Sequence, residues 1–199
     1  NNLLKPSDGR PVTVPTQDMI LGSYYLTLER PGEPGEGKVF RDVNEAQMAY
    51  DEGIIGLHSS IKIRMSKEIN GETVTQLVPT TLGRVIFNAP IPQDLGFVDR
   101  AEDPYALEVD FLCDRSDPAN AFKFEVEFLV KKGNLGQIID KCIRKHGTAI
   151  AAEMLDKIKA QGYKYSTRSG ITVAVCDATI PPQKAELIAA AESKIDKVN

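Results

Sequence analysis

Few residues in this sequence have the types and spacing needed for catalysis or metal binding, and one pair stands out. Cys142 and His146 lie at positions i and i+4 of a helical pattern, a spacing that can hold zinc. However, Cys142 belongs to the apolar stripe of that pattern, and two further ligands are missing nearby. We therefore expect no metal site here, and interpret the pair as a buried thiol and an imidazole at a helix end.

A second candidate for cation binding is the acidic stretch over residues 94–117. Its carboxylates could contact a cation, but they lack the D-x-[DN]-x-[DN]-G order of a calcium loop. We interpret the stretch as a solvated excursion, in which only Arg100 and Arg115 carry positive charge. Its eight acidic residues are Asp94, Asp99, Glu102, Asp103, Glu108, Asp110, Asp114 and Asp117.

The motifs of several enzyme classes are absent from the sequence. It contains neither the G-x-x-x-x-G-K-[ST] P-loop nor the G-x-G-x-x-G dinucleotide fingerprint. The metalloprotease motif H-E-x-x-H and the hydrolase motif G-x-S-x-G do not occur either. From the residues alone we expect an α+β piece that has no active site of its own.

Two positions remain suggestive of ligand contact. Gln17 ends a proline-rich N-terminal loop, residues 1–17, which could hold an amide toward a polar ligand; the alternative is a surface loop tied down by turns. Arg168 precedes a predicted strand over residues 171–175, and a guanidinium at the mouth of a strand often binds phosphate. The alternative for Arg168 is an ordinary salt bridge, for example to Asp177.

Length, composition and charge exclude several classes of protein. The 199 residues, 42% of them hydrophobic, suffice for a core, and the net charge of −4 gives no basic footprint for autonomous nucleic-acid binding. Three cysteines without a CxxC pair favour reduced thiols and a cytoplasmic location. No apolar run approaches the roughly 20 residues of a membrane span.

Periodicity and turn residues predict the elements that position these residues. In the first half we expect a helix over residues 17–27 capped by Thr16, a short strand over 38–40, and a helix from Asp42 or Asn44 to Gly53. A strand over 57–65 then leads into an Asn70-Gly71 hairpin, and Thr80 or Thr81 opens a helical or extended stretch over 82–88.

In the second half, alternating apolar residues predict a strand over 122–130, and a helix from residue 134 ends at His146 and Gly147. A second helix runs from Thr148 to Gly162, and a buried strand covers 171–175. The last helix, from Pro182, carries a narrow seam typical of a coiled coil, formed by Lys184, Ile188, Ala191, Ile195 and Val198. We expect its partner helix to lie outside this sequence. The predicted fold class is α+β, with mixed helices and short antiparallel strands and a truncated helical hairpin at the end.

Four stretches of the sequence also resemble the β′ subunits of bacterial DNA-directed RNA polymerases. The stretches are NNLLKPSDGRP (1–11), VPTQDMILGSYY (14–25), TTLGR (80–84) and TRSGITV (167–173). They fall in the same order as in that family, just after its metal-binding N-A-D-F-D-G-D motif. The resemblance is weakest over residues 93–130.

The resemblance implies a division of the chain and a function. Residues 1–92 would form a pore-region α/β segment, 93–133 a variable acidic excursion and strand, 134–180 a helical pore and funnel segment, and 181–199 the first rim helix. Together they would line the secondary channel near the active centre and contribute to transcription only in the assembled nucleotidyltransferase. Gln17 and Arg168 would then contact the nucleotide path or the RNA 3′ end.

The resemblance further implies partners and a cofactor that lie outside this chain. The partners would be the α, β, ω and σ subunits, the rest of β′, template DNA and RNA, and cleavage or other secondary-channel factors at the rim helix, with no membrane. The catalytic magnesium would be held by aspartates outside this sequence, so that the isolated piece should be inactive. The alternative, from a different class, is an autonomous protein–protein interaction module that uses the acidic stretch and the last helix.

Overall fold

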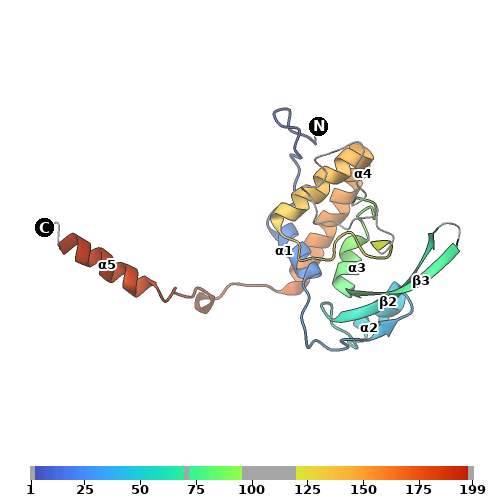
Figure 1. Cartoon of the computed structure of the whole chain (residues 1–199), viewed down its shortest axis with the longest axis horizontal. Coiled ribbons are helices and arrows are strands. Elements are labelled where there is room, and N and C mark those ends of the chain that lie inside the picture. The colour runs from blue at the N-terminus through green and yellow to red at the C-terminus, as the bar shows by residue number, and fades with distance from the viewer. Residues whose placement is uncertain (1–2, 70–71, 96–119, 197–199) are drawn as a thin grey trace. The chain divides into compact units, whose positions relative to one another are not determined.

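The computed structural model describes residues 3–69, 72–95 and 120–196, which belong to two compact units, Asn1–Ser169 and Gly170–Asn199 (Figure 1). The first unit combines helices with a small three-stranded sheet. This confirms the predicted α+β class.

The first unit begins with an irregular loop that leads into helix α1, Asp18–Thr27. A bridge between Leu4 and Pro11 closes the loop on itself, and the Lys5 N–H donates to the Arg10 carbonyl at 2.8 Å. The helix starts one residue later than predicted, because Gln17 has a non-helical backbone and serves as the N-cap residue.

The sheet is formed by β1 (Val39–Phe40), β2 (Ser60–Ile69) and β3 (Glu72–Thr81), in that spatial order. β1 pairs parallel to β2, and β2 pairs antiparallel to β3 with Ile69 opposite Glu72. That register confirms the predicted hairpin, although its turn residues, Asn70 and Gly71, lie outside the described residues. The alternation predicted for β2 is also confirmed, because Ile61 and Ile63 are buried.

Strand β3 lies at the edge of the sheet, and the position of Pro79 within it suits an edge strand. The Lys62 N–H donates to the Lys38 carbonyl on the β1 side at 2.9 Å, so Lys62 and its partner Pro79 form a non-hydrogen-bonded pair. The Pro79 nitrogen therefore faces the free edge, where its missing N–H removes no bond from the ladder.

Two short helices begin where their capping residues predicted. In α2, Val43–Asp51, the Asp42 carboxylate accepts from the Glu45 N–H at 2.9 Å. In α3, Leu82–Asn88, the Thr81 hydroxyl accepts from the Arg84 N–H at 3.2 Å. The side chain of a single N-cap residue thus fixes the start of each helix.

Two breaks were predicted in the region of helix α4, Lys132–Ser169, and the structure contains one of them. Gly147 has φ 80° and separates two helical halves, as predicted from His146 and Gly147. The expected stop at Gly162 was wrong, because the helix continues to Ser169. Gly162 instead lies where α4 meets α1, and a Cβ there would be 2.7 Å from the Met19 Cα.

The strand predicted over residues 122–130 was also wrong. Phe122, Phe124, Val126 and Val130 are buried as the alternation predicted, but the backbone pairs with no neighbouring strand among the described residues. Glu125, expected to face solvent, is only 1% exposed. Side chains from other elements bind the backbone of this segment in place of a strand.

The second unit contains a single 3-10 turn, Val175–Asp177, and helix α5, Lys184–Asp196, within its described residues. The buried strand predicted over residues 171–175 was wrong, since Val173 is 84% exposed and no described strand pairs with it. A β-branched run favours extended backbone, but a strand also needs a hydrogen-bonded neighbour. Leu187 and Ile195 of α5 are exposed as well.

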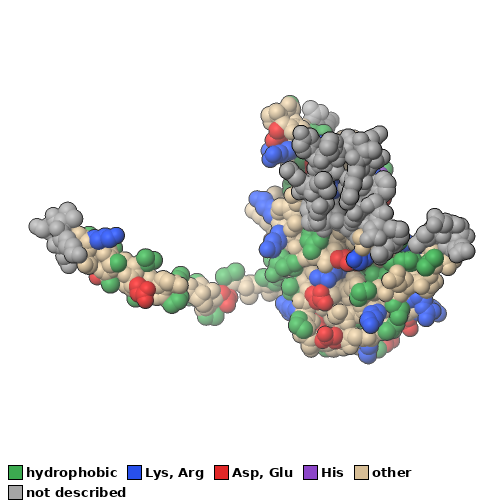
Figure 2. Space-filling view, in the orientation of Figure 1, with side chains coloured by type: hydrophobic (Ala, Val, Ile, Leu, Met, Phe, Trp, Pro, Cys, Tyr) green, Lys and Arg blue, Asp and Glu red, His purple; other side chains and the backbone are tan. Residues whose placement is uncertain are grey.

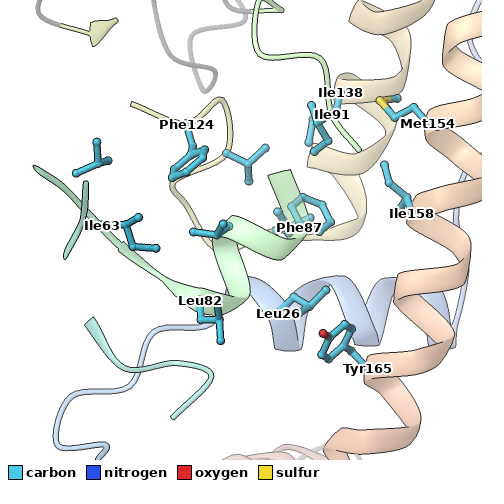
Figure 3. Packing of buried hydrophobic residues seen from close by; sticks show 14 of the residues in the cluster. Leu26, Ile63, Leu82, Phe87, Ile91, Phe124, Ile138, Met154, Ile158 and Tyr165 are labelled. Atoms are coloured by element: carbon cyan, nitrogen blue, oxygen red, sulfur yellow. The ribbon is translucent and has the colours of Figure 1, made fainter. Parts of the chain in front are cut away.

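The core of the first unit lies between its helices and the inner face of the sheet. Figure 3 shows Leu26 of α1, Phe87 of α3 and Ile158 of α4 converging from three elements, and all three side chains are fully buried. Ile63 extends the same cluster to the sheet. This packing holds α1 and α4, the helices that carry or adjoin the candidate residues, in a fixed geometry.

Candidate functional site

Gln17 lies at the point where the N-terminal loop turns into α1. Its backbone has φ 46° and ψ −118°, a conformation that residues other than glycine rarely adopt. Its carbonyl accepts from the N–H groups of Ile20 and Leu21, at 3.0 and 3.1 Å, so the first turn of α1 holds the backbone in place. The side chain is exposed and free to contact a ligand.

Arg168 lies in the last turn of α4, not at the mouth of a strand as predicted. Its guanidinium is 5.9 Å from the ring centroid of Tyr165, a cation–π distance, and the side chain is exposed. Tyr165 itself is 5% exposed and belongs to the core. The exposed guanidinium of Arg168 therefore lies over a buried aromatic ring at the helix end. Asp177, the acid considered as its partner, accepts instead from the Ala174 N–H at 2.8 Å.

The helices that carry these two residues cross at a pair of glycines. A Cβ on Gly22 of α1 would collide with the Gly162 carbonyl, and a Cβ on Gly162 would be 2.8 Å from the Met19 carbonyl. Only residues without a side chain permit so close an approach of two backbones. The crossing ties the position of Gln17 to that of α4, but no hydrogen bond or ion pair joins Gln17 to Arg168 in the described part of the chain.

A buried polar network holds the other end of α1. The Thr27 hydroxyl donates to the Ser23 carbonyl and accepts from the Val130 N–H, both at 2.9 Å. Arg84 of α3 donates to the Thr27 carbonyl at 3.2 Å and pairs with Glu29 at 2.9 Å. A guanidinium beside the last carbonyls of a helix also suits the negative end of its dipole.

Asn88 holds the segment of residues 122–130, which was predicted to be a strand, through its backbone. Its amide donates to the Val126 carbonyl at 2.8 Å and accepts from the Val126 N–H at 3.0 Å, the two bonds that a neighbouring strand would make. Gln93 accepts in turn from the Glu125 N–H at 3.0 Å. Sequence periodicity could not find these residues, because the contacts span 38 and 32 positions of the chain.

The break at Gly147 is accompanied by a charged cluster around Asp94. His146 Nε2 lies 2.7 Å from one Asp94 carboxylate oxygen, and Lys145 Nζ lies 3.5 Å from the other. Partial burial raises the pKa of Asp94, but the hydrogen bond from His146 and the charge of Lys145 outweigh it, and the net pKa is below its ordinary value. The rest of the acidic stretch, apart from Asp94 and Leu95, lies outside the described residues up to Asn120.

The predicted absence of a metal site at Cys142 stays a prediction, although its residue environment is now clear. Cys142 is fully buried, and burial, with a smaller effect of the Asp94 charge, raises the pKa of its thiol. Within residues 3–69, 72–95 and 120–196, no group of three or more His, Cys, Asp or Glu side chains is arranged to hold a metal ion.

His58 was not singled out by the sequence but is the most unusual ionisable group in the first unit. It is 2% exposed, its Nδ1 lies 3.2 Å from the Leu28 carbonyl, and its ring meets that of Tyr25 edge-on with centroids 4.5 Å apart. Its Nε2 is buried and has no hydrogen-bond partner among the residues that the structure describes. Burial lowers the pKa of His58 below its ordinary value. A lone histidine before a strand gives no spacing signal that could have revealed this.

Figure 2 shows charged and hydrophobic side chains interspersed over the visible face of the first unit. Of the helices that the structure describes, none combines the length and the apolar character that crossing a bilayer requires.

Comparison with known proteins relates this geometry to a family. Residues 2–178 match the family model described as RNA polymerase Rpb1, domain 3. The chain is 53% identical over 198 residues to the DNA-directed RNA polymerase subunit beta' of Clostridium acetobutylicum, matching all of this chain and 16% of that protein. The subunits of the same name from Clostridium novyi and Acetivibrio thermocellus are 52% and 53% identical over 198 residues, again over all of this chain and 15% and 16% of their own lengths.

The chain thus spans about a sixth of the length of these relatives. Because the family model covers nearly all of the first unit and the relatives align from end to end, the chain belongs to the RNA polymerase Rpb1 domain 3 family.

Proposed function

We propose that this chain acts as a part of the β′ subunit of a bacterial DNA-directed RNA polymerase, in the cytoplasm, and contributes to DNA-templated RNA synthesis inside the assembled enzyme. The observation that carries the proposal is the end-to-end similarity, at 48–53% identity, to subunits of that name. Similarity of this extent supports the same fold and the same place in the larger protein. The isolated chain would then be inactive, and its partners would be the α, β, ω and σ subunits, the rest of β′, and DNA and RNA.

The finer part of the proposal is that the chain lines the secondary channel near the active centre. Gln17 would donate or accept hydrogen bonds with a triphosphate or with the RNA 3′ end, and Arg168 would attract the same groups through its charge. Two observations support these roles: both side chains are exposed, and each lies at the end of a helix with buried residues in the core.

Magnesium enters this proposal only as an ion that other parts of the enzyme bind. The described residues of this chain do not form a set of carboxylates suited to it. Such an ion would supply electrostatic stabilisation of the transferred phosphoryl group when bound. The residues of this chain would bind and orient the nucleotide on its way in.

The test is made in polymerase reconstituted with full-length β′ that carries Gln17→Ala or Arg168→Ala. A lost hydrogen bond is worth about 0.5–1.5 kcal/mol, so we expect elongation or cleavage of backtracked RNA to slow about two- to tenfold. Gln137→Ala and Arg144→Ala, at exposed positions of α4 away from its last turn, are the matched controls and should leave both rates unchanged. Normal elongation and cleavage in both the Gln17→Ala and the Arg168→Ala enzymes would show that neither residue contacts the nucleotide or the RNA 3′ end.

A second candidate function, an autonomous protein–protein interaction module, is favoured by one observation. Leu187 and Ile195 of α5 are 69% and 59% exposed, which is unusual for large apolar side chains of one helix. A tight and specific protein partner for the 199-residue chain in the absence of the other polymerase subunits would favour this function. Activity that returns only when the remaining subunits are supplied would favour the first.

A further inference from the structure

The face of the sheet that points away from the core carries an ordered set of side chains, which we call the outer sheet face. The strand registers place Val39, Lys62 and Pro79 side by side in one row across β1, β2 and β3. The next row pairs Arg64 with Leu77. These five residues define the outer sheet face.

The described part of the chain leaves the outer sheet face exposed and gives its two cations no acidic partner. All five side chains are exposed, with Val39 at 55% and Leu77 at 43%. Neither Lys62 nor Arg64 forms an ion pair within the described residues, and the nearest acid along the same face of β2 is Glu68, four residues beyond Arg64. Figure 2 shows Lys and Arg side chains beside hydrophobic ones over the part of the molecule that holds the sheet.

We propose that the outer sheet face binds an extended, acidic polypeptide segment with carboxylates at alternate positions. Lys62 and Arg64 are two residues apart on one strand, so their Cα atoms are separated by about 6.8 Å. Carboxylates at i and i+2 of an extended segment have the same spacing and can pair with both cations. This inference goes beyond the proposed function and does not depend on it.

The apolar members of the outer sheet face strengthen such pairing. Val39 and Pro79 flank Lys62, and Leu77 lies directly opposite Arg64 in a non-hydrogen-bonded pair, where side chains are closest. Side chains from the alternating apolar positions of a partner would cover these residues and exclude water from the ion pairs. Ion pairs removed from water are screened less than exposed ones.

A polypeptide fits this face better than a nucleic acid does. Sheets that bind single-stranded nucleic acids present aromatic side chains on which bases stack, and the rows of the outer sheet face contain none.

The experiment titrates the isotopically labelled 199-residue chain with a capped peptide of about ten residues in which glutamate alternates with valine. Nuclear magnetic resonance should show shifts of the Val39, Lys62, Arg64 and Leu77 amides. The double variant Lys62→Gln/Arg64→Gln should bind at least tenfold more weakly. The control Lys157→Gln/Lys159→Gln makes the same charge change on exposed positions of α4 and should bind within twofold of the unmodified chain.

Three outcomes would overturn the inference: unchanged affinity in the Lys62→Gln/Arg64→Gln variant, shifts confined to residues outside the outer sheet face, or stronger binding of an oligothymidylate than of the acidic peptide at the same amides. Leu77→Thr keeps a strand-forming residue and both cations, so it measures the contribution of the apolar contact to peptide binding apart from that of the ion pairs. It should weaken binding severalfold, and an unchanged affinity would reject the apolar part. Equal thermal unfolding midpoints of all variants would show that the sheet is intact.

Discussion

Gln17 is the one non-glycine residue with a positive φ among the residues that the structure describes. Its φ of 46° and ψ of −118° correspond to the first central position of a type II′ turn, which glycine normally occupies. Such strained backbone costs on the order of 1–3 kcal/mol and is often found where a side chain has a functional role. The strain at Gln17 therefore supports its proposed place beside the nucleotide path.

Replacement of Gln17 by glycine should separate the backbone from the side chain. We expect Gln17→Gly to raise the free energy of unfolding by about 1 kcal/mol, because the strain is relieved, while Gln17→Ala should not raise it. Urea unfolding of the 199-residue chain measures both. In reconstituted polymerase both variants should be slow, since both lack the amide; a fast Gln17→Gly enzyme would assign the role to the backbone instead.

His58 should make the stability of the first unit depend on pH. Burial lowers the pKa of His58 in the folded protein, so the unfolded chain, with a pKa of about 6.5, binds more protons as the pH falls. The contribution of neutral His58 to the free energy of unfolding is therefore complete at pH values above the pKa of the unfolded chain and decreases as the pH falls below it. The free energy of unfolding should thus fall between pH 7.5 and 5.5.

The His58→Gln variant shows which part of that fall belongs to the imidazole. Glutamine does not titrate, so the variant should lose less stability than the unmodified chain over the same pH step, in urea unfolding at each pH. The difference can be at most about 1.4 kcal/mol per pH unit for one proton. Parallel pH profiles of the two proteins would show that His58 does not titrate differently on folding.

At the scale of elements, the crossing of α1 and α4 depends on glycines that have no conformational role. Gly162 has ordinary helical backbone, and the contact with Met19 is the reason for its presence. Gly136 in the same helix has open space around its Cα. The two positions form a matched pair.

Gly162→Ala should lower the free energy of unfolding by about 1–3 kcal/mol, since a Cβ 2.7 Å from the Met19 Cα forces the helices apart. Gly136→Ala should instead raise it by about 0.5–1 kcal/mol, because alanine favours the helix. Chemical denaturation of both variants gives the comparison. If the two substitutions change stability equally, the close packing of α1 on α4 is not what requires Gly162.

Polar side chains replace a neighbouring strand for one segment of the backbone. Thr27, Asn88 and Gln93 take the place of a neighbouring strand for residues 124–130, and the same Thr27 belongs to the helix that follows Gln17. The segment that borders the acidic stretch is thus anchored to the helix beside the proposed channel.

On the scale of the whole molecule, the buried hydrophobic core residues that the structure describes all lie between Leu26 and Tyr165. We therefore expect a chain shortened to residues 1–169 to fold by itself, with a free energy of unfolding within about 1 kcal/mol of the 199-residue chain. Circular dichroism and urea unfolding test this. A loss of more than about 3 kcal/mol would mean that residues 170–199 contribute to the stability of the first unit.

The sequence alone determined the features that depend on residues close together in the chain. The hairpin around Asn70 and Gly71 and the break at Gly147 each follow from a few neighbouring residues. Each helix cap was narrowed to two residues, Asp42 or Asn44 and Thr80 or Thr81, of which the structure uses Asp42 and Thr81. Alternation also predicted the burial of Phe122, Phe124, Val126 and Val130, but not that of Glu125. Motifs in fixed order were enough to indicate the family.

Only the tertiary structure decided what depends on partners far away in the sequence. Gly162 looks like a helix stop until α1 is packed against it. The irregular segment of residues 124–130 donates hydrogen bonds to, or accepts them from, side chains up to 103 positions away. Residues 171–175 have the propensity of a strand, but Val173 is exposed and no strand among the described residues pairs with it. Local spacing sets backbone preference, whereas close backbone contact and hydrogen-bond pairing require the second surface to be present.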